Sequence, residues 1–138
     1  MSDIIVGYDG SECARAALHT ALEVAAAYGD KVVIAFGYEL SPVAGELHDY
    51  AAALKDMATK RLAEGSALAA ASGAQVETAV VTGGPAAGLV ELADARDARV
   101  IVVGTRGESP LKGALLGSTP HKLLQLSDRP VLVVPAPQ

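Results

Sequence analysis

Five short runs of apolar, largely β-branched residues alternate along this chain with longer segments of helical composition. The runs read DIIVGY, KVVIAFGY, QVETAVV, RVIVVG and PVLVVP, at residues 3–8, 31–38, 75–81, 99–104 and 130–135. They are apolar nearly throughout, a pattern typical of strands that are buried on both faces. Parallel strands joined by helices make right-handed crossovers. The alternation therefore predicts an α/β fold: one doubly wound, Rossmann-like domain with a five-stranded parallel sheet and helices on both faces.

Four helices are expected between these strands. Their segments are residues 11–28, 46–72, 85–96 and 120–127, rich in Ala, Leu, Glu and Lys with apolar positions three and four apart. Ser11 is a candidate N-cap, and Gly29 and Gly73 stand where a left-handed residue ends a helix. Pro85 and Pro120 suit a first helical turn, so the boundaries agree with the periodicity.

Length and composition limit the function classes. The 138 residues, 51% of them hydrophobic, suffice for a single domain over residues 1–138. A net charge of -5 and 4% aromatic residues argue against nucleic acid as a partner. No apolar run reaches the length of a membrane span. With one cysteine, Cys13, and a start at Met1 without a basic and apolar leader, the expected location is the cytoplasm.

The segment after the fourth expected strand is unusually rich in glycine. It carries Gly104, Gly107 and Gly117, and then Ser118 and Thr119, before the last expected helix. In an open parallel sheet, ligands bind beyond the carboxyl ends of the strands, and a helix start there favours an anion. Glycines let the backbone approach a ligand, and hydroxyls add donors, which indicates a phosphate site. The alternative is that the glycines only form turns and that one hydroxyl caps the helix.

Two other phosphate motifs are absent from the sequence, namely Gly-x4-Gly-Lys-[Ser/Thr] and a Gly-x-Gly-x-x-Gly after the first strand. What is present is Gly104-x2-Gly107-x9-Gly117-Ser118. This spacing resembles the ATP-binding signature of the universal stress protein family, G-x2-G-x9-G-[S/T]. The similarity extends over essentially the whole chain, through IIVGYDGSECARAAL and GGPAAGLVELADARDARVIVVGTRG.

The resemblance implies a set of nucleotide-binding residues. Gly104, Gly107, Gly117 and Ser118 would surround the phosphates of ATP, with Mg²⁺ possible and Thr119 adjacent. Adenine would lie against the ends of the first two strands, which places Gly7, Tyr8, Asp9 and Gly37 in the site.

Asp9 and Gly37 leave alternatives open. The Asp9 carboxylate is a strong acceptor for ribose hydroxyls or an adenine amino group, but it can equally cap the next helix or form a turn with Gly10 and Ser11. Phe36-Gly37 stands where many family members carry His-Val. Gly37 is therefore expected to loosen the base pocket or to let Tyr38 fold into it, which leaves base affinity and selectivity open.

No catalytic or metal site is predicted. The sequence shows no paired nucleophile and base, and its three histidines lack metal-ligand spacing. Arg106 and Lys112 could contact phosphates, although loop cations are more often solvated. Three functions remain: an ATP-dependent regulatory switch in stress response, a slow ATPase or phosphotransferase, and an interaction protein that prefers AMP, cyclic AMP or no nucleotide. Protein partners cannot be read from the sequence.

The last expected strand suggests self-association. An open apolar edge invites pairing with another chain, and Pro135 and Pro137 would stop the pairing from extending. The family commonly forms homodimers through this strand, so the resemblance implies a homodimer through Val131–Val134. The alternative is a monomer whose edge is blunted by the prolines.

Overall fold

The computed structural model describes residues 1–37, 47–106 and 116–137. The strands are β1 (Asp3–Gly7), β2 (Lys31–Gly37), β3 (Val76–Val81), β4 (Val100–Gly104) and β5 (Val131–Val134). The helices are α1 (Glu12–Tyr28), α2 (Leu47–Ala69), α3 (Pro85–Arg96) and α4 (Ser118–Leu126), and a short 3₁₀ turn, η1 (Ala70–Ser72), follows α2. In the described part of the chain, no helix has the length and apolarity of a membrane span.

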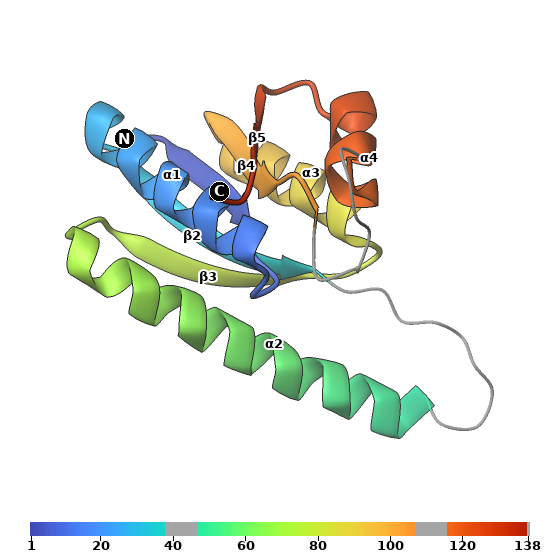
Figure 1. The fold of residues 1–138 in the computed structure, drawn as a ribbon. Helices are drawn as coiled ribbons and strands as arrows, with labels where there is room; N and C mark the ends of the chain where they lie inside the picture. Colours follow the sequence, from blue (N-terminus) through green and yellow to red (C-terminus); the bar gives the residue numbers. More distant parts are fainter. Residues whose placement is uncertain (38–46, 107–115, 138) are drawn as a thin grey trace.

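The five strands form one parallel sheet in the order β3-β2-β1-β4-β5 (Figure 1). The chain runs outward from β1 to β2 and β3, and then returns to the other side of β1 for β4 and β5. The strand order thus reverses between β1 and β4, which creates a crevice at their carboxyl ends. The predicted doubly wound α/β fold is confirmed.

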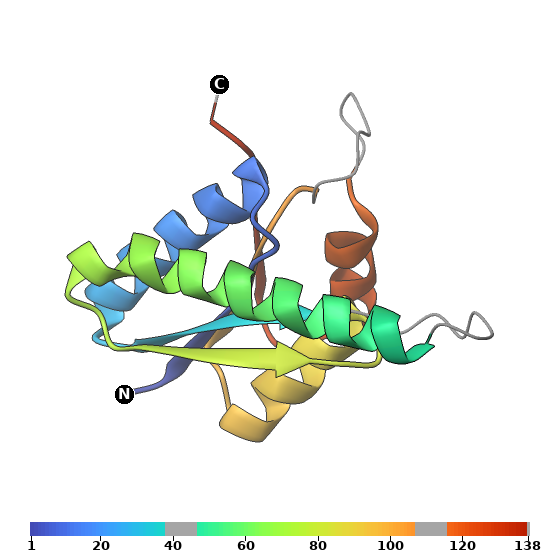
Figure 2. The ribbon, with the colours of Figure 1, turned by 90° about the horizontal axis from the view of Figure 1, so that it is seen from below.

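Helices cover the sheet on both faces, with α1 and α2 on one side and α3 and α4 on the other (Figure 2). The β1 side chains alternate between the two cores that result. Ile4 and Val6, like Tyr8 just after the strand, face the α1 and α2 side, and Ile5 faces the α3 and α4 side. Because the central strands are buried on both faces, their continuous apolar runs were a reliable signal in the sequence.

Several helix ends follow local rules that the sequence shows. Ser11 caps α1, since its Oγ accepts a hydrogen bond from the Ala14 N–H at 3.1 Å, and Gly29 and Gly73 adopt the left-handed conformation. The last helix was expected from about residue 120 and begins two residues earlier, while the prediction that Pro120 lies in the first helical turn is confirmed. That helix starts at Ser118, behind an extended Gly117, and Pro120 is its third residue.

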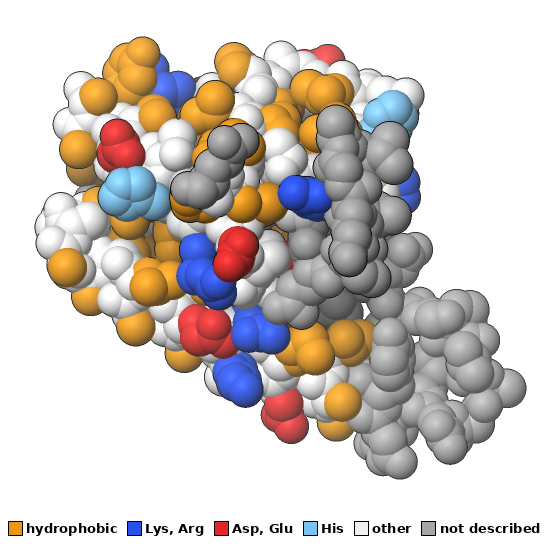
Figure 3. Space-filling view, viewed as in Figure 1, with side chains coloured by type: hydrophobic (Ala, Val, Ile, Leu, Met, Phe, Trp, Pro, Cys, Tyr) orange, Lys and Arg blue, Asp and Glu red, His pale blue; other side chains and the backbone are white. Residues whose placement is uncertain are grey.

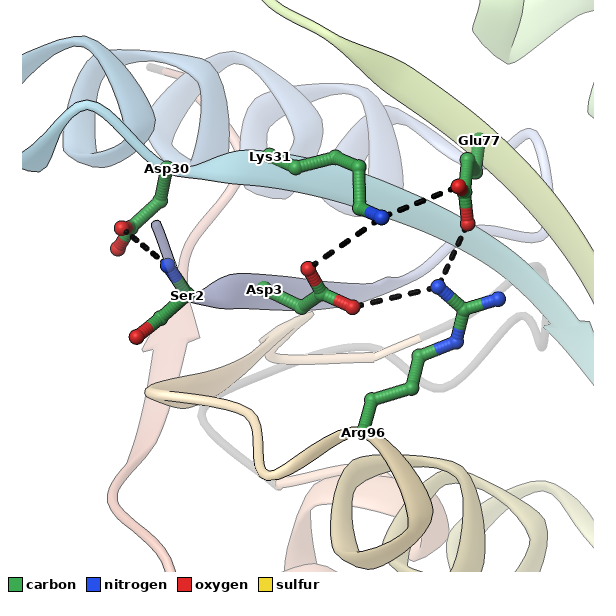
Figure 4. Close-up of polar contacts among 6 residues, drawn as sticks. All are labelled: Ser2, Asp3, Asp30, Lys31, Glu77 and Arg96. Carbon is green, nitrogen blue, oxygen red and sulfur yellow. Dashed lines mark hydrogen bonds and ion pairs between the residues drawn. The ribbon is translucent and has the colours of Figure 1, made fainter.

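Charged side chains connect the elements at the amino ends of the strands (Figure 4). Lys31 Nζ lies 3.0 Å from Glu77 and 3.6 Å from Asp3, and the Arg96 guanidinium bonds Glu77 and Asp3 at 2.6 and 3.2 Å. These four residues come from β1, β2, β3 and α3. Their ion pairs link the three strands and α3 at the end of the sheet opposite the crevice.

Candidate functional site

Three neighbouring strands, β1, β2 and β4, end in glycine at the same edge of the sheet: Gly7, Gly37 and Gly104. A Cβ at Gly7 would lie 3.1 Å from both Leu89 and Val103 side chains. A Cβ at Gly104 would lie 2.5 Å from Cys13 Cβ. The glycines therefore let the covering helices approach the strand ends, and the floor of the crevice consists of backbone.

Gly37 has the same role on β2. A Cβ added there would lie 2.8 Å from Pro85 Cα and 2.9 Å from Val81 Cγ2. The sequence suggested that a glycine here loosens the pocket, but the start of α3 fills the space beside it. The turn before α3 makes this approach possible, because Gly83 and Gly84 have φ of 83° and 101°, which suit only glycine.

A pocket lies at the reversal point between β1 and β4 and extends toward β2. It is lined by Gly7, Tyr8, Asp9, Ala14, Ala35, Gly37, Pro85, Leu89, Val103, Gly104, Arg106, Thr119 and Pro120. Six of the residues predicted from the sequence thus come together around one space. One side of that space is apolar, formed by α3, and the other is polar, formed by the start of α4.

Asp9 lies in the turn that connects β1 to α1. Its Oδ1 accepts a hydrogen bond from the Ser11 N–H at 3.0 Å, so the turn with Gly10 and Ser11 that the sequence left open is present. Helix capping falls to Ser11 instead. A carboxylate offers several acceptor positions, and Asp9 also lines the pocket, so this bond leaves it able to accept from a ligand.

Tyr8 contributes to the pocket from the core. The residue is 2% exposed, its N–H donates to the Ala35 carbonyl at 2.8 Å, and its ring reaches the α2 side, 3.5 Å from a Cβ placed on Gly65. Its phenolic oxygen is buried and has no hydrogen-bond partner among the residues that the structure describes. Burial, and after it the Glu64 carboxylate, raise the pKa of Tyr8 above its usual 10.0.

The start of α4 forms the polar side. Gly117 is the N-cap and has no side-chain cap, so neither Ser118 nor Thr119 serves as the ordinary cap that the sequence left open. The first intrahelical bond is donated by His121 to the Gly117 carbonyl at 3.2 Å. The Ser118 and Thr119 N–H groups belong to the first turn, where helices present amides to anions.

The other predicted residues either are described but do not line the pocket or lie outside the described residues. Gly117 is buried against Thr105 and Arg106, and Ser118 is exposed at the first helical position. Gly107, Lys112 and Tyr38 lie outside the described residues. Pro85 and Leu89 were missed, and only the Gly-Gly-Pro sequence before α3 pointed to a special turn there.

Cationic and anionic groups alternate around the turn after β1. Arg15 donates to the Gly10 carbonyl at 2.6 Å, and the Arg61 guanidinium lies where a Gly10 side chain would be, 2.9 Å from Glu64. In Figure 3, basic and acidic side chains lie next to one another over the middle of the face that Figure 1 also views. Within the described ranges, no three His, Cys, Asp or Glu side chains gather closely enough to hold a metal ion.

Comparisons with known proteins place the chain in a family. A family model described as the universal stress protein family matches residues 1–135. Universal stress protein MJ0531 of Methanocaldococcus jannaschii is 30% identical over 142 residues, which cover 98% of this chain and 82% of the relative. A crystal structure of a universal stress protein in complex with cAMP is 34% identical, with a TM-score of 0.77 and coverage of 99% and 98%.

A more distant structure has the same fold. It is a universal stress protein family protein from Arabidopsis thaliana with AMP bound, at 15% identity, a TM-score of 0.74 and coverage of 99% and 93%. The fold and the pocket define a doubly wound parallel α/β protein. Its pocket lies where the strand order reverses, the usual place of a ligand in such sheets. With the family model matching nearly every residue, the chain belongs to the universal stress protein family.

Proposed function

We propose that this chain is an adenine-nucleotide-binding module, a homodimeric universal stress protein domain over residues 1–138 whose occupancy by ATP switches its interactions in a stress response. The observation that carries the proposal is the convergence of Asp9, Gly104 and Thr119 on one pocket at the reversal point. An acceptor, a bare backbone and a helix start are three features that a nucleotide requires.

The parts of the nucleotide match different sides of the pocket. The base would lie in the apolar part near Gly7, Gly37 and Pro85, where backbone groups offer hydrogen bonds at its edge. The ribose would lie near Asp9, whose carboxylate accepts from hydroxyls.

The phosphates would lie at the first turn of α4. Ser118 and Thr119 would supply amides and hydroxyls there, and the helix dipole adds favourable charge. Gly104 and Gly117 belong to the same cradle, as does Gly107 by the spacing of the signature. Any Mg²⁺ would be coordinated by the triphosphate of ATP and would bind together with it.

The relatives support an adenine nucleotide and leave its phosphate number to experiment. One related structure holds cAMP and another holds AMP. We assign ATP because Gly104-x2-Gly107-x9-Gly117-Ser118 has the spacing of the family's ATP-binding signature.

Calorimetric titration of the nucleotide-stripped protein with Mg-ATP, AMP, cAMP and adenosine tests the proposal. Binding of ATP should weaken about tenfold or more in Ser118→Glu, since a like charge about 4 Å from a phosphate costs on the order of 1 kcal/mol or more. The same carboxylate stabilises a helix start, so this variant should fold. Gln125→Glu adds that charge at an exposed position of α4 two turns away and should bind as the parent does.

Each outcome has a clear meaning. A folded parent that gives no heat with any of the four ligands at two temperatures would overturn the proposal. Tighter binding of cAMP or AMP than of ATP would replace the assigned ligand. Phosphate released in the ATP sample, and lost in Ser118→Glu, would show hydrolysis in addition to binding.

A further inference from the structure

Thr105, the residue after β4, uses each of its polar groups to bond a different part of the fold. Its N–H donates to the Val134 carbonyl at the end of β5, at 2.9 Å, and its carbonyl accepts from the Gly117 N–H at 2.7 Å. Its Oγ1 lies 3.4 Å from Cys13 Sγ in the first turn of α1. One residue thus joins the edge strand, the cap of α4 and the start of α1.

Cys13 holds the Thr105 side chain from a fixed position. It is 5% exposed, and its Cβ packs against the backbone of Gly104 so closely that no side chain fits there. Burial raises the pKa of the Cys13 thiol, but its hydrogen bonds with Thr105, Arg106 and Ala136 together bring that pKa below its usual 9.0. The Thr105 hydroxyl thus has a buried partner whose position is fixed by α1.

Gly117 is held by the Thr105 backbone, since its N–H donates to the Thr105 carbonyl. As the N-cap, it decides where the Ser118 and Thr119 amides point, and a Cβ on it would lie 3.2 Å from the Thr105 carbonyl oxygen and 3.0 Å from Arg106 Cα. A shift of Thr105 would therefore move the start of α4 relative to the pocket.

We propose that Thr105 is the positioning residue of the phosphate cradle: it holds Gly117, and with it the first amides of α4, at a fixed distance from β5 and α1. This inference rests on the proposed function for the identity of the ligand. The role of Thr105 rests on its three contacts, to Val134, Gly117 and Cys13. That role is to orient other groups, not to touch the ligand.

Thr105→Val tests the role because it keeps both backbone bonds and the side-chain shape but removes the hydroxyl. Affinity for AMP should fall about fivefold, the effect of one hydrogen bond, while affinity for adenosine, which has no phosphate, stays within about twofold of the parent. Thr105→Ser keeps the hydroxyl and should restore AMP binding. A general loss of structure would weaken both ligands alike, and serine would not rescue it.

Cys13→Ala removes the other partner of the same contact. If the two residues act together, the double variant of Thr105→Val with Cys13→Ala should bind AMP about as weakly as either single variant. Losses that multiply would show that Cys13 acts independently of Thr105, and would overturn its part in the mechanism.

Hydrogen exchange of the unliganded protein makes the inference testable without a nucleotide. The Gly117 amide should exchange about fivefold faster in Thr105→Val than in the parent or in Thr105→Ser. If the parent binds no adenine nucleotide, the proposed function fails and this exchange still decides the role of Thr105. If the parent binds AMP while Thr105→Val alters neither the AMP-to-adenosine ratio nor the Gly117 exchange, the inference fails alone.

Discussion

At the scale of single residues, the shape of the pocket depends on side chains that are missing from strand ends. Gly37 lies in ordinary extended β-strand, so its backbone does not require glycine. Its neighbours do, because Pro85 Cα and Val81 Cγ2 occupy the place of a side chain. The base side of the proposed site is thus set by how closely α3 approaches β2.

Gly37→Ala should open this contact. The added methyl group meets backbone at 2.8 Å, so the start of α3 must move, at a cost of about 1–3 kcal/mol in the free energy of unfolding. Adenosine affinity should fall with it, measured by calorimetry beside urea unfolding. Gly73→Ala is the control, because Gly73 has a positive φ, its added Cβ meets nothing within 4 Å, and it ends η1 rather than lining the pocket. Equal adenosine affinity in Gly37→Ala and the parent would disprove the role of the contact.

Asp30 is a second residue whose surroundings dictate its chemistry. Its side chain has no exposed surface, and it accepts hydrogen bonds from Arg99 Nε at 2.5 Å and from the Ser2 N–H at 2.9 Å. Arg99 also lies 4.1 Å from the centre of the Tyr28 ring. The hydrogen bond from Arg99, opposed by burial and aided by Ser2, lowers the pKa of Asp30 below its usual 3.8.

Asp30→Asn should lower the free energy of unfolding at pH 7 by about 1–3 kcal/mol, because a charge-assisted bond is lost. The contribution of Asp30 is fully present above pH 3.8, its ordinary pKa, and is lost as the pH falls through the lower folded value, since the unfolded state binds the proton first. Urea unfolding between pH 7 and pH 3 measures this. The variant should lose less stability than the parent over the acid range, and parallel curves would contradict the assignment.

At the scale of elements, the start of each helix shows what a sequence can and cannot predict. Ser11 was predictable as a cap because capping is local: its Oγ accepts from the N–H of Ala14, three residues on. The start of α4 was placed two residues late because Gly117 bonds Thr105, twelve residues earlier in the chain. Proline alone gave no sign of that contact.

The same limit applies to the candidate site. Gly7, Gly37 and Gly104 could be assigned to the crevice because glycines at adjacent strand ends meet at one edge of a parallel sheet. The sequence could not show why these positions need glycine. Residues that would clash with a Cβ come from helices whose packing the sequence does not show, namely Leu89, Pro85 and Cys13. Pro85 and Thr105 were missed for this reason, as each acts through a neighbour distant in the chain.

Ser11→Ala tests the local rule at α1. Loss of the cap should lower the free energy of unfolding by about 1 kcal/mol, and Ser11→Asp, which also caps and adds charge at the helix start, should retain it. Thermal unfolding of the three proteins measures both effects. Alanine and aspartate variants of equal stability would show that α1 is held by packing alone.

At the scale of the whole molecule, the two ends of the sheet have different roles. The amino ends are joined by the Asp3, Lys31, Glu77 and Arg96 pairs and by Asp30 with Arg99. At the carboxyl ends, glycines, a polar helix start and a pocket meet instead. This division fixes the strands at one end and leaves backbone available to a ligand at the other.

The sheet also has two edges, β3 and β5, and the proposed dimer uses β5. Leu132 on β5 is 37% exposed, and Val80 on β3 is 48% exposed, so each edge presents an apolar side chain. We expect Val131–Val134 to pair with a second copy because Pro135 and Pro137 limit the pairing to a short strand, a device that closes a dimer rather than building a fibre.

Sedimentation then decides between the edges. The parent should sediment at twice the 14.0 kDa chain mass. Leu132→Glu brings two carboxylates together across the proposed interface and should raise the dimer dissociation constant about tenfold or more. Val80→Glu makes the same kind of change on β3 and should leave the dimer intact. A parent that sediments as a monomer would remove the proposed dimer, whereas dissociation by Val80→Glu alone would move it to the opposite edge of the sheet.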